Sequence, residues 1–286
     1  MVVVLFFLSL ILFSLLFCFQ YITIFKYRHY YLLILLESDK EMENKILSQK
    51  LEEILGLETP PVAVKIIKTK DPLPDIKLPT QNSRYCQLLM LAKKGQTLML
   101  TAEKIACPAA KAALGLGPLP EKISTGEMLC AIGLFSSKEA AAKTMGMIPR
   151  IKLGTTKAVV AGPLKDFPME PDVVVVESVP EHIMWLGLAS NFKEGGRLNF
   201  NSSIFQAECV DVTTVPYLTG EVNITPGCYG CRQATDTPPE HMFIGIPAKR
   251  LPEIVESLEA LSKKAMSAVR EKSVYELYTK GLTSKR

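Results

Sequence analysis

The chain has 286 residues, of which 48% are hydrophobic and 22% charged, and its 33 basic and 29 acidic side chains leave a formal net charge of +4. This length is enough for one large domain or two small ones with a substantial core. The positive excess is spread along the chain and forms no basic run with interleaved aromatic residues, so we expect no nucleic-acid partner.

The N-terminus carries the longest apolar run of the sequence. Residues 2–25 contain no charged side chain, and this length suffices for a helix that crosses a bilayer. The first basic residues follow the run, which for a membrane anchor would place the rest of the chain in the cytoplasm. Alternatively, Met42 is the true start and residues 1–41 are an over-extended reading of the gene. Both interpretations predict a cytoplasmic domain over residues 42–286, and only the first predicts a membrane partner.

Apolar spacing predicts the first elements of this domain. Residues 43–55 carry a helical stripe that Gly56 ends, and residues 62–67 are rich in the β-branched side chains that favour a strand. Residues 71–81 form a loop that contains three prolines. The next predicted elements are a helix at 86–92, a strand at 97–101 and a helix at 108–114.

The second half of the domain alternates between helices and strands. Residues 172–177 form the continuous run Asp-Val-Val-Val-Val-Glu, which is typical of a strand buried on both faces. The other predicted elements are helices at 138–145, 180–189 and 251 to about 271, with strands at 157–161 and 242–246. This irregular alternation predicts an α/β to α+β fold, with a mixed central sheet, flanking helices and a single main domain.

Six of the seven cysteines fall in the predicted domain, where a reducing cytoplasm argues against a disulfide framework. Cys130 lies in an apolar stretch and is predicted to be a core residue. Cys107 precedes Pro108 at a predicted helix N-terminus, where the helix dipole favours a thiolate. Cys228 and Cys231 form a glycine-flanked C-x-x-C motif, whose backbone is free to wrap around a metal ion or cluster.

A series of short motifs follows in a specific order and spacing: Pro61-Val62-Ala63-Val64, Cys86, Ala106-Cys107-Pro108-Ala109-Ala110, Leu114-Gly115, Ala161-Gly162-Pro163-Leu164, Pro171-Asp172-Val173-Val174-Val175, Ala207-Glu208-Cys209, Gly227-Cys228-Tyr229-Gly230-Cys231-Arg232 and Gly245-Ile246-Pro247. From about residue 45 to residue 270, this series resembles the prokaryotic domain of unknown function 169 family, which is frequent in anaerobic archaea and bacteria. The resemblance implies no reaction, because members have no established activity. It implies motif cysteines at Cys86, Cys107, Cys209 and Cys228. Cys231 stands where relatives more often have a small residue, which leaves its role open.

The scattered cysteines favour an iron–sulfur cluster. A [4Fe–4S] cluster accepts four thiolates from separate loops and helix ends. The expected ligands are Cys86, Cys107, Cys209 and Cys228, with Cys231 as a further metal candidate. Zinc is the alternative metal, although a structural zinc site usually has two C-x2-C pairs and this chain has one. A cluster would serve electron transfer or small-molecule chemistry, so the sequence leaves open whether the chain is an enzyme.

Two metal-free interpretations remain open. Cys228 and Cys231 have the spacing of a dithiol oxidoreductase, but that chemistry needs the first cysteine at a helix start directly after a strand, and here the sequence soon reaches two prolines. Alternatively, the cysteines are structural and the pocket binds a small anion, with Arg197 and Arg232 as its contacts. His241 is predicted to be a surface-loop residue.

Overall fold

A computed structural model describes residues 40–283, so the apolar run at residues 2–25 lies outside the described part. Six strands form one open sheet, in the order β2 (Leu98–Thr101), β3 (Thr156–Pro163), β1 (Val62–Lys68), β4 (Val173–Ser178), β6 (Met242–Pro247) and β5 (Asn223–Thr225). Neighbouring strands are antiparallel throughout this sheet. The predicted α+β class is confirmed. The mixed sheet is not found, because the helical connections return the chain antiparallel to its neighbour instead of completing βαβ crossovers.

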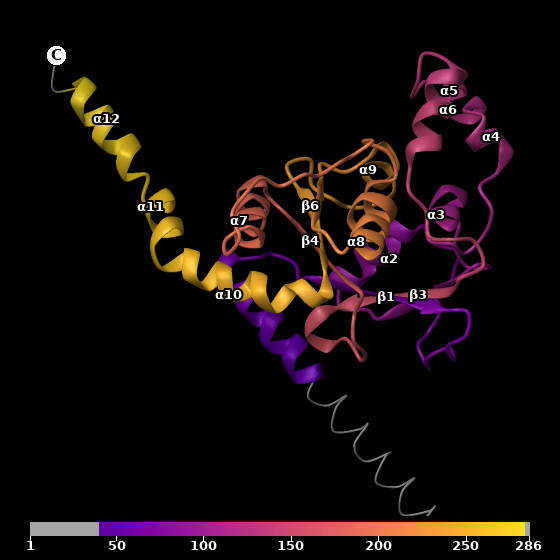
Figure 1. Ribbon diagram of the computed structural model, residues 1–286, viewed down its shortest axis with the longest axis horizontal. Helices are drawn as coiled ribbons and strands as arrows, with labels where there is room; N and C mark the ends of the chain where they lie inside the picture. Colours follow the sequence, from indigo (N-terminus) through magenta and orange to yellow (C-terminus); the bar gives the residue numbers. More distant parts are fainter. Residues whose placement is uncertain (1–39, 284–286) are drawn as a thin grey trace, which may run out of the picture.

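Both faces of the sheet are covered by helices (Figure 1). Successive side chains of a strand point to opposite faces, so Val62 and Val64 of β1 join one core while Ala63 and Ile67 join the other. One face is packed against α2 (Tyr85–Lys93), α3 (Pro108–Ala113) and a π-helix, η2 (Ala207–Thr214). The other is packed against the helix that covers residues 40–55, α7 (Pro180–Ser190) and α10 (Leu251–Leu261). β4 is buried along its whole length, as its apolar run predicts.

The remaining helices lie around this framework. They are α4 (Glu121–Ser124), α5 (Glu127–Ala131), α6 (Lys138–Met147), α8 (Val215–Thr219), α9 (Tyr229–Ala234), α11 (Ser267–Arg270) and α12 (Ser273–Thr283). Figure 1 shows α11 and α12 extending away from the sheet. In α5 the core position belongs to Leu129, and Cys130 is only half-buried, so its predicted place in the core is wrong. Across residues 40–283, no helix has both the length and the apolar character required to cross a membrane.

The π-helix η2 is buried over its full length and packs directly on the sheet. Contact with β6 is close at Gly245, where a Cβ atom would lie 2.2 Å from the backbone oxygen of Val212. Ile204 and Gln206, just before η2, have positive φ angles of 53° and 60°, which are uncommon for residues other than glycine. π-helical turns and strained residues are frequent at functional sites, which directs attention to the side chains that η2 carries.

Candidate functional site

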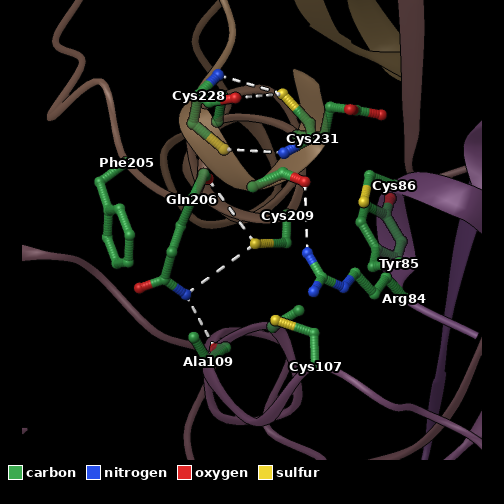
Figure 2. Close-up of a pocket in the computed structure, with 14 residues that line it drawn as sticks. Arg84, Tyr85, Cys86, Cys107, Ala109, Phe205, Gln206, Cys209, Cys228 and Cys231 are labelled. Atoms are coloured by element: carbon green, nitrogen blue, oxygen red, sulfur yellow. Dashed lines mark hydrogen bonds between the residues drawn. The ribbon is translucent and has the colours of Figure 1, made fainter. Parts of the chain in front are cut away.

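Five cysteines line one cavity on the face of the sheet that η2 covers. They come from α2, the start of α3, η2 and α9, and Figure 2 shows them around the hollow: Cys86, Cys107, Cys209, Cys228 and Cys231. The cavity volume is about 80 Å³. Because a single water needs about 10–15 Å³, there is room for a group of several atoms.

Cys228 and Cys231 form reciprocal hydrogen bonds at the start of α9. The N-cap residue is Cys228, whose Sγ accepts from the Cys231 backbone N–H at 3.5 Å, while its own backbone N–H donates to Cys231 Sγ at 3.0 Å. The Cys231 thiol donates to the Cys228 carbonyl oxygen at 3.1 Å. β5 ends at Thr225, so the motif follows a strand closely and begins a helix. The sequence-based objection to a dithiol site was therefore wrong, because α9 is short enough to end at Ala234, before the two prolines.

These contacts give the two thiols opposite protonation preferences. The neighbouring Cys231 side chain is the largest influence that lowers the pKa of Cys228 to about 6, helped by the backbone amides of Ala207, Cys231 and Gly230 and opposed by burial. The Cys228 side chain, together with burial, raises the pKa of Cys231 far above its ordinary value. These opposite shifts favour ionisation of Cys228 before Cys231.

The other three cysteines occupy helix starts and η2. Cys86 is in the first turn of α2, Cys107 is the N-cap of α3, and Cys209 belongs to η2. Burial raises the pKa of both Cys86 and Cys209, and the charge of Glu208 adds to the effect at Cys86. The Cys209 thiol donates to the Gln206 carbonyl oxygen at 3.6 Å. Cys86 and Cys209 are therefore neutral thiols unless a cation lies beside them.

Two buried side chains of the cavity wall carry a polar oxygen that has no hydrogen-bond partner within the described residues. These oxygens are Gln206 Oε1 and Glu208 Oε1. The Gln206 amide Nε2 donates to the Ala109 carbonyl at 2.8 Å, so only its oxygen is left over. Burial, followed by the charge of Glu177, raises the pKa of Glu208 well above its usual range. A buried acceptor without a protein partner calls for an explanation, and a role in binding a ligand or ion is one.

A buried ion-pair network supplies the charge that acts on Glu208. Glu177 pairs with Lys93, and these two side chains are 5% and 10% exposed. It also accepts from the Thr237 hydroxyl at 3.3 Å and lies 3.2 Å from His241 Nδ1. His241 is buried, so its predicted surface position is wrong, because Glu177 gives its ring a polar partner inside the fold. The network therefore fixes the Glu177 carboxylate near Glu208, where, in addition to burial, its charge raises the pKa of Glu208.

The two arginines predicted to contact an anion do not line the cavity. The guanidinium of Arg232 donates at 2.6 Å to each of three carbonyl oxygens, those of Pro226, Pro238 and His241. It therefore fastens the loops on either side of α9 to each other. Arg197 is exposed in its glycine-rich loop.

Arg84 lines the cavity instead, and sequence reasoning missed it. Its Nη1 donates to the Gly230 carbonyl oxygen at 3.4 Å, and Figure 2 shows the guanidinium extending among the sulfurs. The one available signal was its position, at the N-cap of α2 and two residues before Cys86. That spacing alone does not say that its side chain turns towards cysteines more than a hundred residues away.

The sulfurs do not form a compact shell for a single ion. Within residues 40–283, no group of three or more His, Cys, Asp or Glu side chains is arranged to hold one metal ion. Cys130 is not among the residues that line the cavity. The donors are therefore spread around a hollow and do not converge on one point.

The model of the domain of unknown function 169 family, described as an uncharacterised ArCR, matches residues 50–257. An uncharacterized protein of Methanocaldococcus jannaschii, MJ0308, is 31% identical over 216 residues, which cover 74% of this chain and 92% of the relative. No solved structure matches the chain. The matched region contains all five cavity cysteines, and the chain belongs to the domain of unknown function 169 family.

Proposed function

We propose that the cysteine cavity binds an iron–sulfur cluster that serves electron transfer or small-molecule chemistry. The observation that carries the proposal is the gathering of five cysteines from four segments around one cavity. A [4Fe–4S] cluster takes four thiolates and supplies one-electron transfer when bound. The proposed ligands are Cys86, Cys107, Cys209 and Cys228, with Cys231 as the fifth sulfur.

The electrostatics of the cavity wall support a metal cluster as the ligand of the thiols. Burial keeps the pKa of Cys86 and Cys209 high, so these thiols ionise only beside a positive charge. A bound metal deprotonates a coordinating thiol outright. The Cys228 sulfur already receives hydrogen bonds from backbone amides, and such hydrogen bonds to sulfur tune the reduction potential of a cluster.

Zinc is the less favoured metal. Zinc–sulfur bonds of about 2.3 Å require four ligands around one point, and the described residues contain no group arranged in this way. In a cluster each thiolate binds a different iron, so the sulfurs stand farther apart. A cavity with sulfurs spread around its wall therefore suits the cluster better.

A dithiol oxidoreductase is the second candidate, favoured by the reciprocal hydrogen bonds of Cys228 and Cys231 at the start of α9. In this reaction, the Cys228 thiolate attacks a substrate disulfide, forms a mixed disulfide and releases one substrate thiolate. Cys231 loses its proton and attacks Cys228 Sγ, which closes the Cys228–Cys231 disulfide and releases the second substrate thiol. Two electrons pass to the substrate, and an external dithiol reductant restores the pair.

Metal analysis of the anaerobically purified full chain separates these candidates. The cluster predicts about four iron and four sulfide per chain, with a broad absorbance near 400 nm that bleaches on reduction. Zinc without sulfide would support the zinc alternative. Protein free of both metals, with a Cys228–Cys231 disulfide that forms and is reduced reversibly, would support the dithiol reaction instead.

Single substitutions then test the ligand assignment. Cys228→Ser should lose most of the iron, because a missing ligand exposes the cluster and leaves it incompletely coordinated. Cys130→Ser is the matched control, since this half-buried cysteine lies outside the cavity, and it should keep full iron content. Retention of iron by Cys228→Ser together with its loss in Cys231→Ser would move the assignment to Cys231.

A further inference from the structure

We propose that the cysteine cavity takes a small carboxylate as its ligand, and that Arg84 binds the carboxylate group beside the sulfurs. This inference rests on the proposed function only in treating the cavity as the working site. A carboxylate and a cluster would compete for the same hollow, so the proposal concerns the cavity without a cluster and is tested on reduced, metal-free protein.

The guanidinium of Arg84 is available for a ligand. An arginine has five N–H donors, and in the described part of the chain this side chain makes one hydrogen bond, the long contact of 3.4 Å to Gly230 O. Lys93, the basic residue at the far end of α2, is already paired with Glu177 in a buried network. No described carboxylate forms an ion pair with Arg84, so its charge is free to attract an anion from solution.

Arg84 and the sulfur of Cys228 border the same spot. A methyl group added to Gly230 would lie 3.9 Å from Cys228 Sγ and 4.0 Å from Arg84 Nη1. An anion held by the guanidinium would therefore sit within reach of the sulfur. The planar fork of an arginine matches a carboxylate through two parallel hydrogen bonds.

The rest of the cavity suits the carbon part of such a ligand. Its lining includes the apolar side chains of Ala109, Ala110 and Phe205 beside the sulfurs. The volume of about 80 Å³ limits the ligand to a few carbon atoms. A short-chain carboxylate would place its charge on Arg84 and its hydrocarbon against this apolar wall.

Paired alkylating reagents test the proposal on the anaerobically purified full chain. Iodoacetate carries a carboxylate and iodoacetamide is its neutral counterpart, so the ratio of their rates measures attraction of the anion and cancels the reactivity of the thiol. Peptide mass spectrometry gives this ratio for each cysteine. The chain is reduced and freed of metal before labelling, so that no cavity thiol is held by a metal ion or cluster.

In Arg84→Gln, the iodoacetate-to-iodoacetamide ratio at the free cavity cysteine should fall about tenfold, which corresponds to the loss of about 1.4 kcal/mol of charge attraction. Arg84→Lys should keep part of the preference, because it retains the charge without the planar fork. Cys130 in the same samples is an internal control, and its iodoacetate-to-iodoacetamide ratio should not change in Arg84→Gln. Arg197→Gln removes an exposed arginine outside the cavity and should leave the ratio at the cavity cysteine unchanged.

An unchanged ratio in Arg84→Gln would overturn the proposal. An equal slowing of both reagents would overturn it too, since Arg84 would then act on the thiol and not on the anion. Failure of either reagent to reach any cavity cysteine in the wild-type chain would show that the cavity admits no such ligand. If Arg84→Gln unfolds, protection of the wild-type cavity cysteine by acetate, but not by acetamide, makes the same distinction. Iron and sulfide content is measured separately, so the cluster proposal can fail while this one stands.

Discussion

Replacing Cys231 with alanine should raise the pKa of Cys228. In the folded chain, the Cys231 side chain makes the largest contribution to lowering this pKa from the ordinary value of 9.0 to about 6. Alanine removes that side-chain thiol and leaves all three backbone amides in place, those of Ala207, Gly230 and residue 231. We therefore expect the pKa of Cys228 to rise by at least about one unit in Cys231→Ala, and by less in Cys231→Ser, which keeps a hydroxyl donor.

The expected change in the pKa of Cys228 determines which assay is suitable. A thiol with a pKa of 6 is about 90% ionised at pH 7, whereas one with a pKa of 9 is about 1% ionised. A rate at a single pH would understate the change, because a thiolate becomes more nucleophilic as its pKa rises. The measurement is therefore the pH at which iodoacetamide labelling of Cys228 is half-maximal, between pH 4 and pH 10, in reduced and metal-free protein.

Cys130→Ala is the control and should leave the midpoint for Cys228 near pH 6, because it does not touch the cavity. A midpoint that stays near pH 6 in Cys231→Ala would refute the reasoning. The amides at the start of α9 would then be sufficient to stabilise the thiolate, and the second cysteine would have no part in activating the first.

Three further predictions concern the fold around the site. Gly245→Ala should lower the free energy of unfolding by about 3 kcal/mol or more in a denaturant titration, since its Cβ would lie 2.2 Å from backbone oxygen of η2. Gly146 has open space around it, so Gly146→Ala should leave the free energy of unfolding unchanged or raise it. Equal losses of unfolding free energy in the two variants would contradict the close contact at Gly245. Glu177→Ala should cost about 3–5 kcal/mol because it leaves Lys93 buried without its partner, and a loss below 1 kcal/mol would argue that Lys93 reaches solvent. Burial raises the pKa of Asp211 from 3.8 to about 6, so the folded state binds this proton more tightly than the unfolded state. The resulting stabilisation is lost as the pH rises from about 4 to 6. Asp211→Asn should therefore make the free energy of unfolding less dependent on pH over that interval, and an unchanged pH dependence would contradict the assignment.

Sequence patterns predicted the regular elements well and the site only in part. The β-branched runs of β1 and β4 and the glycine that ends the helix at residue 55 are local signals, and these elements were found close to their predicted bounds. The π-helix η2 was not predicted, because its turns follow neither the helical nor the strand period. Its conformation depends on packing against β6, which the local sequence does not encode.

The arginines also show that local sequence does not predict tertiary contacts. Arg232 stands beside the C-x-x-C motif, and a charge next to a thiol suggested an anion contact. In the structure its guanidinium donates to three carbonyl oxygens of neighbouring loops, and the positions of these loops depend on tertiary structure. Arg84 is close to Cys86 in sequence, but its position beside Gly230 depends on contact between segments separated by 146 residues. Sequence patterns singled out the five cysteines that line the cavity, and long-range packing decided which arginine joins them.

The wide separation of the cavity cysteines along the chain has a consequence for how the protein would mature. Cys86 and Cys107 lie before β3, whereas Cys209 and Cys228 follow α7, so the sulfurs meet only after the sheet has joined both halves of the chain. An unfolded polypeptide offers an incoming metal only the local Cys228–Cys231 pair. Assembly of a four-thiolate site must then follow folding, and occupancy of the cavity would tie the two halves together. Limited proteolysis before and after anaerobic iron and sulfide loading would reveal this order as protection appearing in both halves at once.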